Sequence, residues 1–186
     1  MSAHGATRRR ALQAAGAAAA ALALPAPARG AVDKELVKKV GRRVVAAAIL
    51  GEETKAVAVE AIANGHLLTP SQTATMRLLH DHATEHASLL GMLMKQDLGA
   101  DAPLAPKRTA IPGLLRLRDA SAALRLALDL EERAVAQHIA AVRALHDAQI
   151  IRAIAGIVAS DGQHLVLLRQ LLHEEPVPNA FERGGT

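Results

Sequence analysis

A helical repeat of apolar residues constrains the fold of this chain more than any other feature. In two stretches, positions of one face recur at alternating spacings of three and four residues, as on one side of a helix. Such a face has to be buried against other helices, so the repeat predicts an all-α fold. The first stretch comprises Met76, Leu79, Ala83, His86, Leu90 and Leu93, and the second comprises Ile154, Ile157, Asp161, His164, Leu168 and Leu171.

Glycine and proline residues divide the chain after residue 31 into four helical segments. Asn64-Gly65 is a helix stop signal, and Thr69-Pro70-Ser71 starts the next helix. Pro176 and Pro178 prevent continuation beyond the last segment. We therefore expect helices over about residues 33–64, 71–98, 114–145 and 148–173.

The connections between these segments alternate short, long and short. Residues 99–113 contain three prolines and two glycines, and a loop of this length reaches ~50 Å when extended. A helix of about 25 residues is ~38 Å long, so the loop can cross the whole bundle. This predicts an antiparallel four-helix bundle over residues 31–175, with one long crossover between the second and third helices. A simple up-and-down bundle is the alternative.

Composition supports helices and narrows the chemistry. Aromatic residues are only 1% of the chain, while alanine and leucine, both strong helix formers, dominate it. The lack of aromatic side chains argues against modules that stack nucleic-acid bases. No cysteine is present, which excludes disulfides, thiolate catalysis and iron–sulfur sites. Any metal has to be held by carboxylates and imidazoles, which suits iron, manganese or zinc.

Residues 1–28 resemble a leader for export. The run Thr7-Arg8-Arg9-Arg10-Ala11-Leu12-Gln13 resembles the twin-arginine signal, with Ala11 and Gln13 where Phe and Lys are usual. The apolar stretch that follows, up to Leu24, is too short and too rich in alanine for a membrane span, and Ala26-Pro27-Ala28 is a small-x-small cleavage site. We expect export to the periplasm or another extracytoplasmic space, with cleavage and no integral membrane span afterwards. A flexible alanine-rich arm or an uncleaved anchor is the alternative.

The leader also accounts for the basic charge of the chain. It holds three of the 22 basic residues and none of the 18 acidic ones, so the remaining chain has 19 basic and 18 acidic residues. A mature chain this close to neutral indicates neither a nucleic acid nor an anionic membrane as a partner.

Charged and imidazole side chains lie on the apolar helix faces. Glu53 has Ile49, Leu50, Ala56 and Val57 as its neighbours three and four positions away, and Glu131 has similar neighbours. A buried unpaired carboxylate is costly, so each needs a cation, a histidine or water as its partner.

The same faces bring together a set of metal-ligand side chains. Asp161 and His164 form a carboxylate-x-x-His arrangement, by which four-helix-bundle proteins ligate metal pairs. The second helix offers His86, but Ala83 stands where its carboxylate is expected, and His82 is the substitute. The candidate ligands are Glu53, His82, His86, Glu131, Asp161 and His164, with Glu60, Glu85 and His138 as candidates to support them by hydrogen bonds.

Three motifs in the C-terminal half carry a resemblance to a known family. Glu131-Glu-Arg-Ala-Val-Ala, Asp161-Gly-Gln-His164 and the tail Pro176-Val-Pro-Asn-Ala-Phe181 look like those of exported bacterial ferritin-like proteins. The likeness covers residues 45–182. It therefore includes most of the C-terminal tail, which we place at residues 176–186. It implies a ferritin-like bundle with a di-iron-type centre and does not imply an iron-storage shell. Asp161 replaces the usual Glu, and His138 stands where a Tyr is common.

We therefore expect an exported ferritin-like protein that binds one or two transition-metal ions, iron or manganese. The resemblance implies di-iron oxidase or peroxide-related chemistry if two ions bind. The alternative is a metal-free ferritin-like scaffold or interaction protein of the cell envelope. A homodimer is compatible with either, because helices with small residues pack closely.

Overall fold

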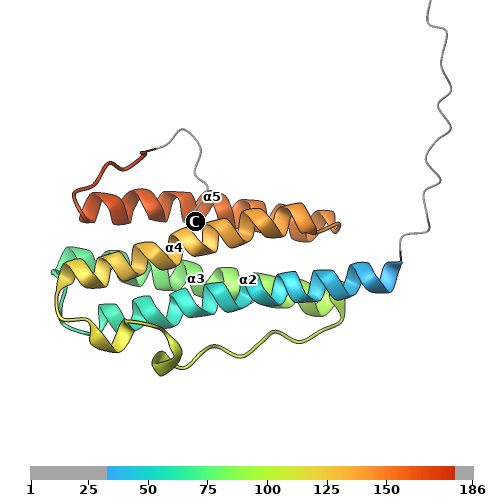
Figure 1. The fold of residues 1–186 in the computed structure, drawn as a ribbon, viewed down its shortest axis with the longest axis horizontal. Coiled ribbons are helices and arrows are strands. Elements are labelled where there is room, and N and C mark those ends of the chain that lie inside the picture. The colour runs from blue at the N-terminus through green and yellow to red at the C-terminus, as the bar shows by residue number, and fades with distance from the viewer. Residues whose placement is uncertain (1–32, 179–186) are drawn as a thin grey trace, which may run out of the picture. The chain divides into compact units, whose positions relative to one another are not determined.

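The computed structural model describes residues 33–178 of the chain. Four long helices make up most of this part, and it contains no β-strand (Figure 1). The leader and the tail beyond Pro178 lie outside the described residues. The helices are α2 (Lys34–Ala63), α3 (Pro70–Leu98), α4 (Ala120–Ala144) and α5 (Ala148–Leu171), and two 3₁₀ turns, η1 (Arg108–Ala110) and η2 (Leu114–Arg116), precede α4.

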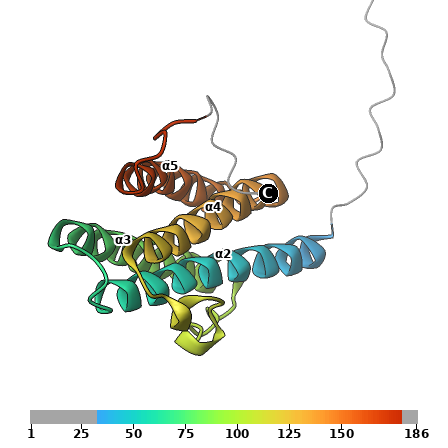
Figure 2. The same cartoon turned by 60° about the vertical axis from the view of Figure 1, so that its left-hand side comes forward.

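The long connection between α3 and α4 sets the topology. It leaves the end of α3, runs back along the bundle beside α2 and enters α4 at the opposite end (Figure 1). As a result α3 and α4 point the same way, and each helix is antiparallel to those it packs on, as the second view also shows (Figure 2). The predicted all-α bundle with one long crossover is confirmed.

Local hydrogen bonds define where the helices begin. Asp33 accepts from the backbone N–H groups of Glu35 and Leu36, and Thr69 forms a capping box with Gln72. These side chains satisfy N–H groups that have no partner inside the helix. At the other end of α3, Gly99 adopts a left-handed conformation with φ 63°, as the sequence signal predicts.

The start of α4 differs from the prediction. The apolar pattern places it at Leu114, but the helix begins at Ala120, after Asp119 caps it by accepting from the N–H of Ala122 at 2.8 Å. Leu114 lies in a 3₁₀ turn that follows Gly113, whose φ is 85°. Leu114 is nevertheless buried, so its place in the core does not require the helix to include it.

The apolar core of the bundle consists of two separate clusters. One gathers around Ile62, Leu79, Leu124 and Leu168, and the other around Ile49, Leu90 and Ile154. Between them lies a layer of charged and imidazole side chains, all contributed by positions in the middle of the four helices.

Helix α5 is long and apolar enough to cross a membrane by length and composition alone. Its buried face carries Asp161 and His164, which contact charged groups of α2 and α4. These contacts are those of a core helix in a bundle.

Candidate metal centre

Eight side chains, two from each helix, meet in the middle of the bundle, and we call them the central cluster. Six of them are buried, while the two histidines of α3 are partly exposed. The cluster consists of Glu52 and Lys55 from α2, His82 and His86 from α3, Glu131 and His138 from α4, and Asp161 and His164 from α5.

Lys55 is the common partner of three carboxylates. Its Nζ lies 3.0 Å from an oxygen of Glu52, 2.9 Å from one of Glu131 and 2.9 Å from one of Asp161. Burial by itself would lower the pKa of Lys55, but the charges of Glu131, Glu52 and Asp161 outweigh it and raise the pKa above its ordinary value. The ammonium therefore stays charged although only 2% of the residue is exposed.

Asp161 lies at the centre of the remaining contacts. Its second oxygen accepts a hydrogen bond from Nδ1 of His138 at 3.2 Å, and its first lies 3.7 Å from Nδ1 of His86. Burial would raise the pKa of Asp161, but the hydrogen bonds from His138 and His164 and the contact with Lys55 lower it below its usual range. Asp161 is therefore a carboxylate throughout the neutral range.

His164 uses both of its ring nitrogens. Nδ1 lies 3.0 Å from Glu131, and Nε2 lies 2.8 Å from Nδ1 of His82. Burial would lower the pKa of His164, but Asp161 and Glu131 raise it to about 9. At neutral pH the metal-free protein therefore holds His164 as an imidazolium, which donates to Glu131 and to His82.

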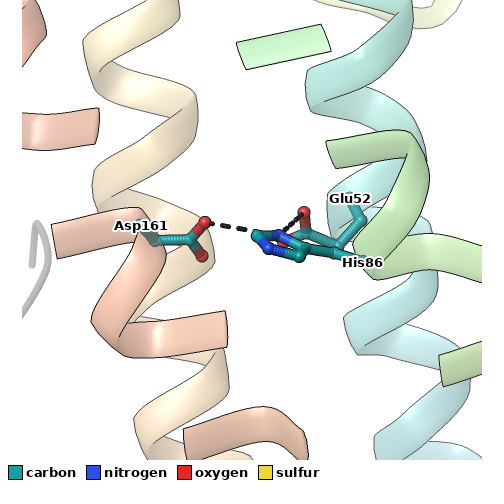
Figure 3. A group of neighbouring side chains, drawn as sticks. All are labelled: Glu52, His86 and Asp161. Carbon is teal, nitrogen blue, oxygen red and sulfur yellow. Dashed lines mark hydrogen bonds and ion pairs between the residues drawn. The ribbon is translucent and has the colours of Figure 1, made fainter. Parts of the chain in front are cut away.

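Two groups of side chains in the cluster have the spacing of metal ligands. Glu52, His86 and Asp161 form one group (Figure 3), and Glu131, Asp161 and His164 form the other, each with its ligand atoms within 4.8 Å of one another. Asp161 belongs to both groups. Carboxylates and imidazoles are ligands that suit iron, manganese and zinc, so the donor chemistry fits a transition-metal ion.

Two buried polar atoms in the cluster are not satisfied by hydrogen bonds. Oε1 of Glu52 and Nε2 of His138 lie 3.5 Å apart without hydrogen-bond geometry, and both residues are fully buried. Oε1 of Glu52 has the ammonium of Lys55 at 3.0 Å as an ion-pair partner. Most buried polar atoms in proteins have a hydrogen-bond partner, so these two atoms have room for one, such as an ion or a water molecule.

The glutamate of α2 that enters the cluster is Glu52, and this corrects the sequence prediction of Glu53. Glu53 is only partly buried, and Leu50, one of its neighbours on the predicted face, is 43% exposed. Glu52 instead lies seven residues after Val45 and seven before Val59, which are both buried. That spacing is the signal that identifies Glu52 from the sequence.

The structure brings the other predicted ligands together. Glu131, Asp161, His164, His86 and His82 all belong to the central cluster.

Of the three residues predicted to support the ligands, the structure places only His138 in the central cluster. It is fully buried and contacts both Asp161 and Glu52. Glu60 pairs with Arg108 at 2.9 Å on the surface, and Glu85 is exposed on α3.

Sequence reasoning missed Lys55. Both Lys55 and Arg133 precede an Ala-Val-Ala run in their helices, but Arg133 is exposed and Lys55 is buried. The signal that could have found it is its position three residues after Glu52, on the same helix face.

Comparisons with known proteins agree with this architecture. The family model described as a ferritin-like domain matches residues 9–174. A solved structure of a conserved hypothetical protein from Mycobacterium tuberculosis is similar with a TM-score of 0.65 and 16% sequence identity, over 77% of this chain and 97% of that chain. No curated protein matches. Because the family model covers most of the sequence, the chain belongs to the ferritin-like family.

Proposed function

We propose that this protein binds a transition-metal ion in the central cluster. The observation that carries the proposal is an imbalance of charge. Three buried carboxylates, those of Glu52, Glu131 and Asp161, face a single permanently charged partner, Lys55. Negative charge left over in a buried layer is unfavourable unless a cation or protonated histidine compensates it. Imidazoles in the same layer supply nitrogen ligands for such a cation, and His164 would give up its ring proton when it binds one.

The residues of the chain have separate tasks in this proposal. Glu131, Asp161 and His164, or Glu52, His86 and Asp161, would hold the ion. His138 orients Asp161 by donating to its second oxygen, and His82 holds the ring of His164. A bound iron or manganese ion would supply redox chemistry of the kind that oxidases and peroxide-consuming proteins use.

Access to the cluster is through α3. The side chain of His86 is 15% exposed and His82 is also partly exposed, whereas the ligands from α2, α4 and α5 are buried. An ion that enters from solvent would therefore meet the two histidines of α3 first.

Metal analysis tests the proposal. We expect metal in protein isolated from its native exported fraction, and we expect Glu131→Ala and His164→Ala to lose it. Glu53→Ala is the matched control, because it removes a glutamate next to Glu52 but outside the cluster. Metal-free wild type whose melting temperature does not change with added Fe²⁺, Mn²⁺ or Zn²⁺ would refute it.

The alternative is a metal-free scaffold or interaction protein of the cell envelope. Lys55 favours this alternative, because it already forms an ion pair with each of the three carboxylates and so compensates part of their charge without a metal ion. The metal analysis separates the two functions.

We also propose export through the twin-arginine route, which the run from Thr7 to Gln13 supports. Fractionation of cells that express the wild type and an Arg8→Lys/Arg9→Lys/Arg10→Lys variant tests it, because only the wild type should reach the extracytoplasmic fraction. The variant replaces all three arginines, so that no arginine pair remains. Equal export of both would refute the route. Homodimer formation stays a prediction.

A further inference from the structure

We propose that the ammonium group of Lys55 takes the place of one metal ion, so that the central cluster holds one transition-metal ion and not two. This inference deepens the proposed function and rests on it. The resemblance to ferritin-like proteins implies a pair of ions, and the structure has a lysine where the carboxylates of three helices converge.

The contacts of Lys55 are those expected of a bridging cation. Its Nζ donates hydrogen bonds to Glu131 and Asp161 at 2.9 Å and forms an ion pair with Glu52 at 3.0 Å, so it contacts carboxylates of three different helices. The Asp161 oxygen next to the ammonium, Oδ1, is also the one nearest His86 and His164. Any ion held by either ligand group would therefore lie beside the ammonium.

The net charge of the central cluster limits how many metal ions can bind beside Lys55. The three carboxylates carry three negative charges, and Lys55 carries one positive charge. One divalent ion makes this set neutral when the histidines are neutral, whereas two divalent ions leave a surplus of two positive charges. In a buried layer such a surplus is strongly unfavourable, because the effective dielectric constant there is low.

Lys55 cannot easily move out of the central cluster to make room for a second metal ion. Only 2% of the residue is exposed, and the cluster lies between the two apolar parts of the core. Moving its charge away from the carboxylates would place it among apolar side chains, which is costly.

Metal stoichiometry in three proteins tests the inference. Metal-free protein is titrated with Zn²⁺ by calorimetry, and bound metal is counted by mass spectrometry after desalting. We expect one equivalent in the wild type, two in Lys55→Met, and one in Lys55→Arg, which keeps the positive charge. Circular dichroism checks that each variant is folded.

The outcomes separate this inference from the proposed function. Two equivalents in the wild type, or one in both the wild type and Lys55→Met, would overturn the role of Lys55 and leave metal binding intact. No metal in the wild type but binding in Lys55→Met would overturn the proposed function and support the role of Lys55. No metal in either would overturn both.

A measurement on the wild type covers the case in which Lys55→Met does not fold. A buried, ion-paired ammonium exchanges its protons slowly, so nitrogen-15 labelled lysine should give a resonance that Lys55→Arg lacks. We expect that resonance to persist after one equivalent of Zn²⁺. Its loss together with uptake of a second equivalent would show that metal displaces the lysine, and would overturn the inference.

Discussion

Replacing Lys55 by methionine removes the ammonium from three carboxylates and keeps most of the volume of the side chain. Glu52, Glu131 and Asp161 are at most 2% exposed, so water cannot take over as their partner. Removing one partner of a buried ion pair costs about 3–5 kcal/mol. Because three carboxylates share this lysine, we expect the loss in metal-free protein to lie near the upper end of that range. The total stability of a domain is only about 5–15 kcal/mol.

Urea unfolding at pH 7 with a chelator, followed by circular dichroism, measures this loss. Thermal unfolding gives a second measure of the same loss. At about 2–4 °C per kcal/mol for a domain of this size, the melting temperature should fall by about 10–20 °C. Lys95→Met is the matched control: Lys95 pairs with Asp101, but the side chains are 65% and 86% exposed. Its effect should stay within about 0.5 kcal/mol. Identical unfolding midpoints and slopes for Lys55→Met and Lys95→Met would refute the reasoning.

Three other measurements test the cluster and the fold. The pKa of His164 in the folded protein is about 9, above its ordinary value of about 6.5, so its protonation stabilises metal-free protein fully below pH 6.5. This contribution, at most about 3 kcal/mol, should be lost as pH rises to 9, and urea unfolding of His164→Gln should lack that decrease. Leu90→Ala, at a fully buried position, should lower the free energy of unfolding by about 2–5 kcal/mol in the same assay. Asp119→Ala should cost about 1 kcal/mol by loss of the cap of α4, and an unchanged unfolding midpoint would contradict that role.

The helices could be predicted from the sequence because their ends carry chemical signals. Thr69, Gly99 and the prolines after α5 act through the local backbone, and their effect depends little on the rest of the molecule. The start of α4 was harder to predict. The predicted helix required Leu114 to be buried, and it is buried in the observed 3₁₀ turn as well. An apolar residue at the right spacing does not distinguish those two backbones.

The site was predictable only in part, for reasons of geometry. Glu52 and Glu53 differ by one residue, which is about 100° around the helix, and the apolar neighbours of Glu53 three and four positions away selected the wrong one. Lys55 was missed because lysine is almost never fully buried unless it is paired, and two of its three carboxylate partners lie on other helices. Its partners Glu131 and Asp161 lie 76 and 106 residues away in the sequence.

The polar layer between the two apolar parts of the core also fixes the position of each helix along the bundle axis relative to its neighbours. Alanine and leucine positions repeat so regularly here that a shift by one turn, about 5.4 Å, would still bring apolar faces together. Such a shift would, however, carry Glu52 and Lys55 away from Glu131 and Asp161 and place their charges against apolar side chains. The cluster therefore specifies a single register for the bundle, in the way that one buried polar position sets the register of a coiled coil.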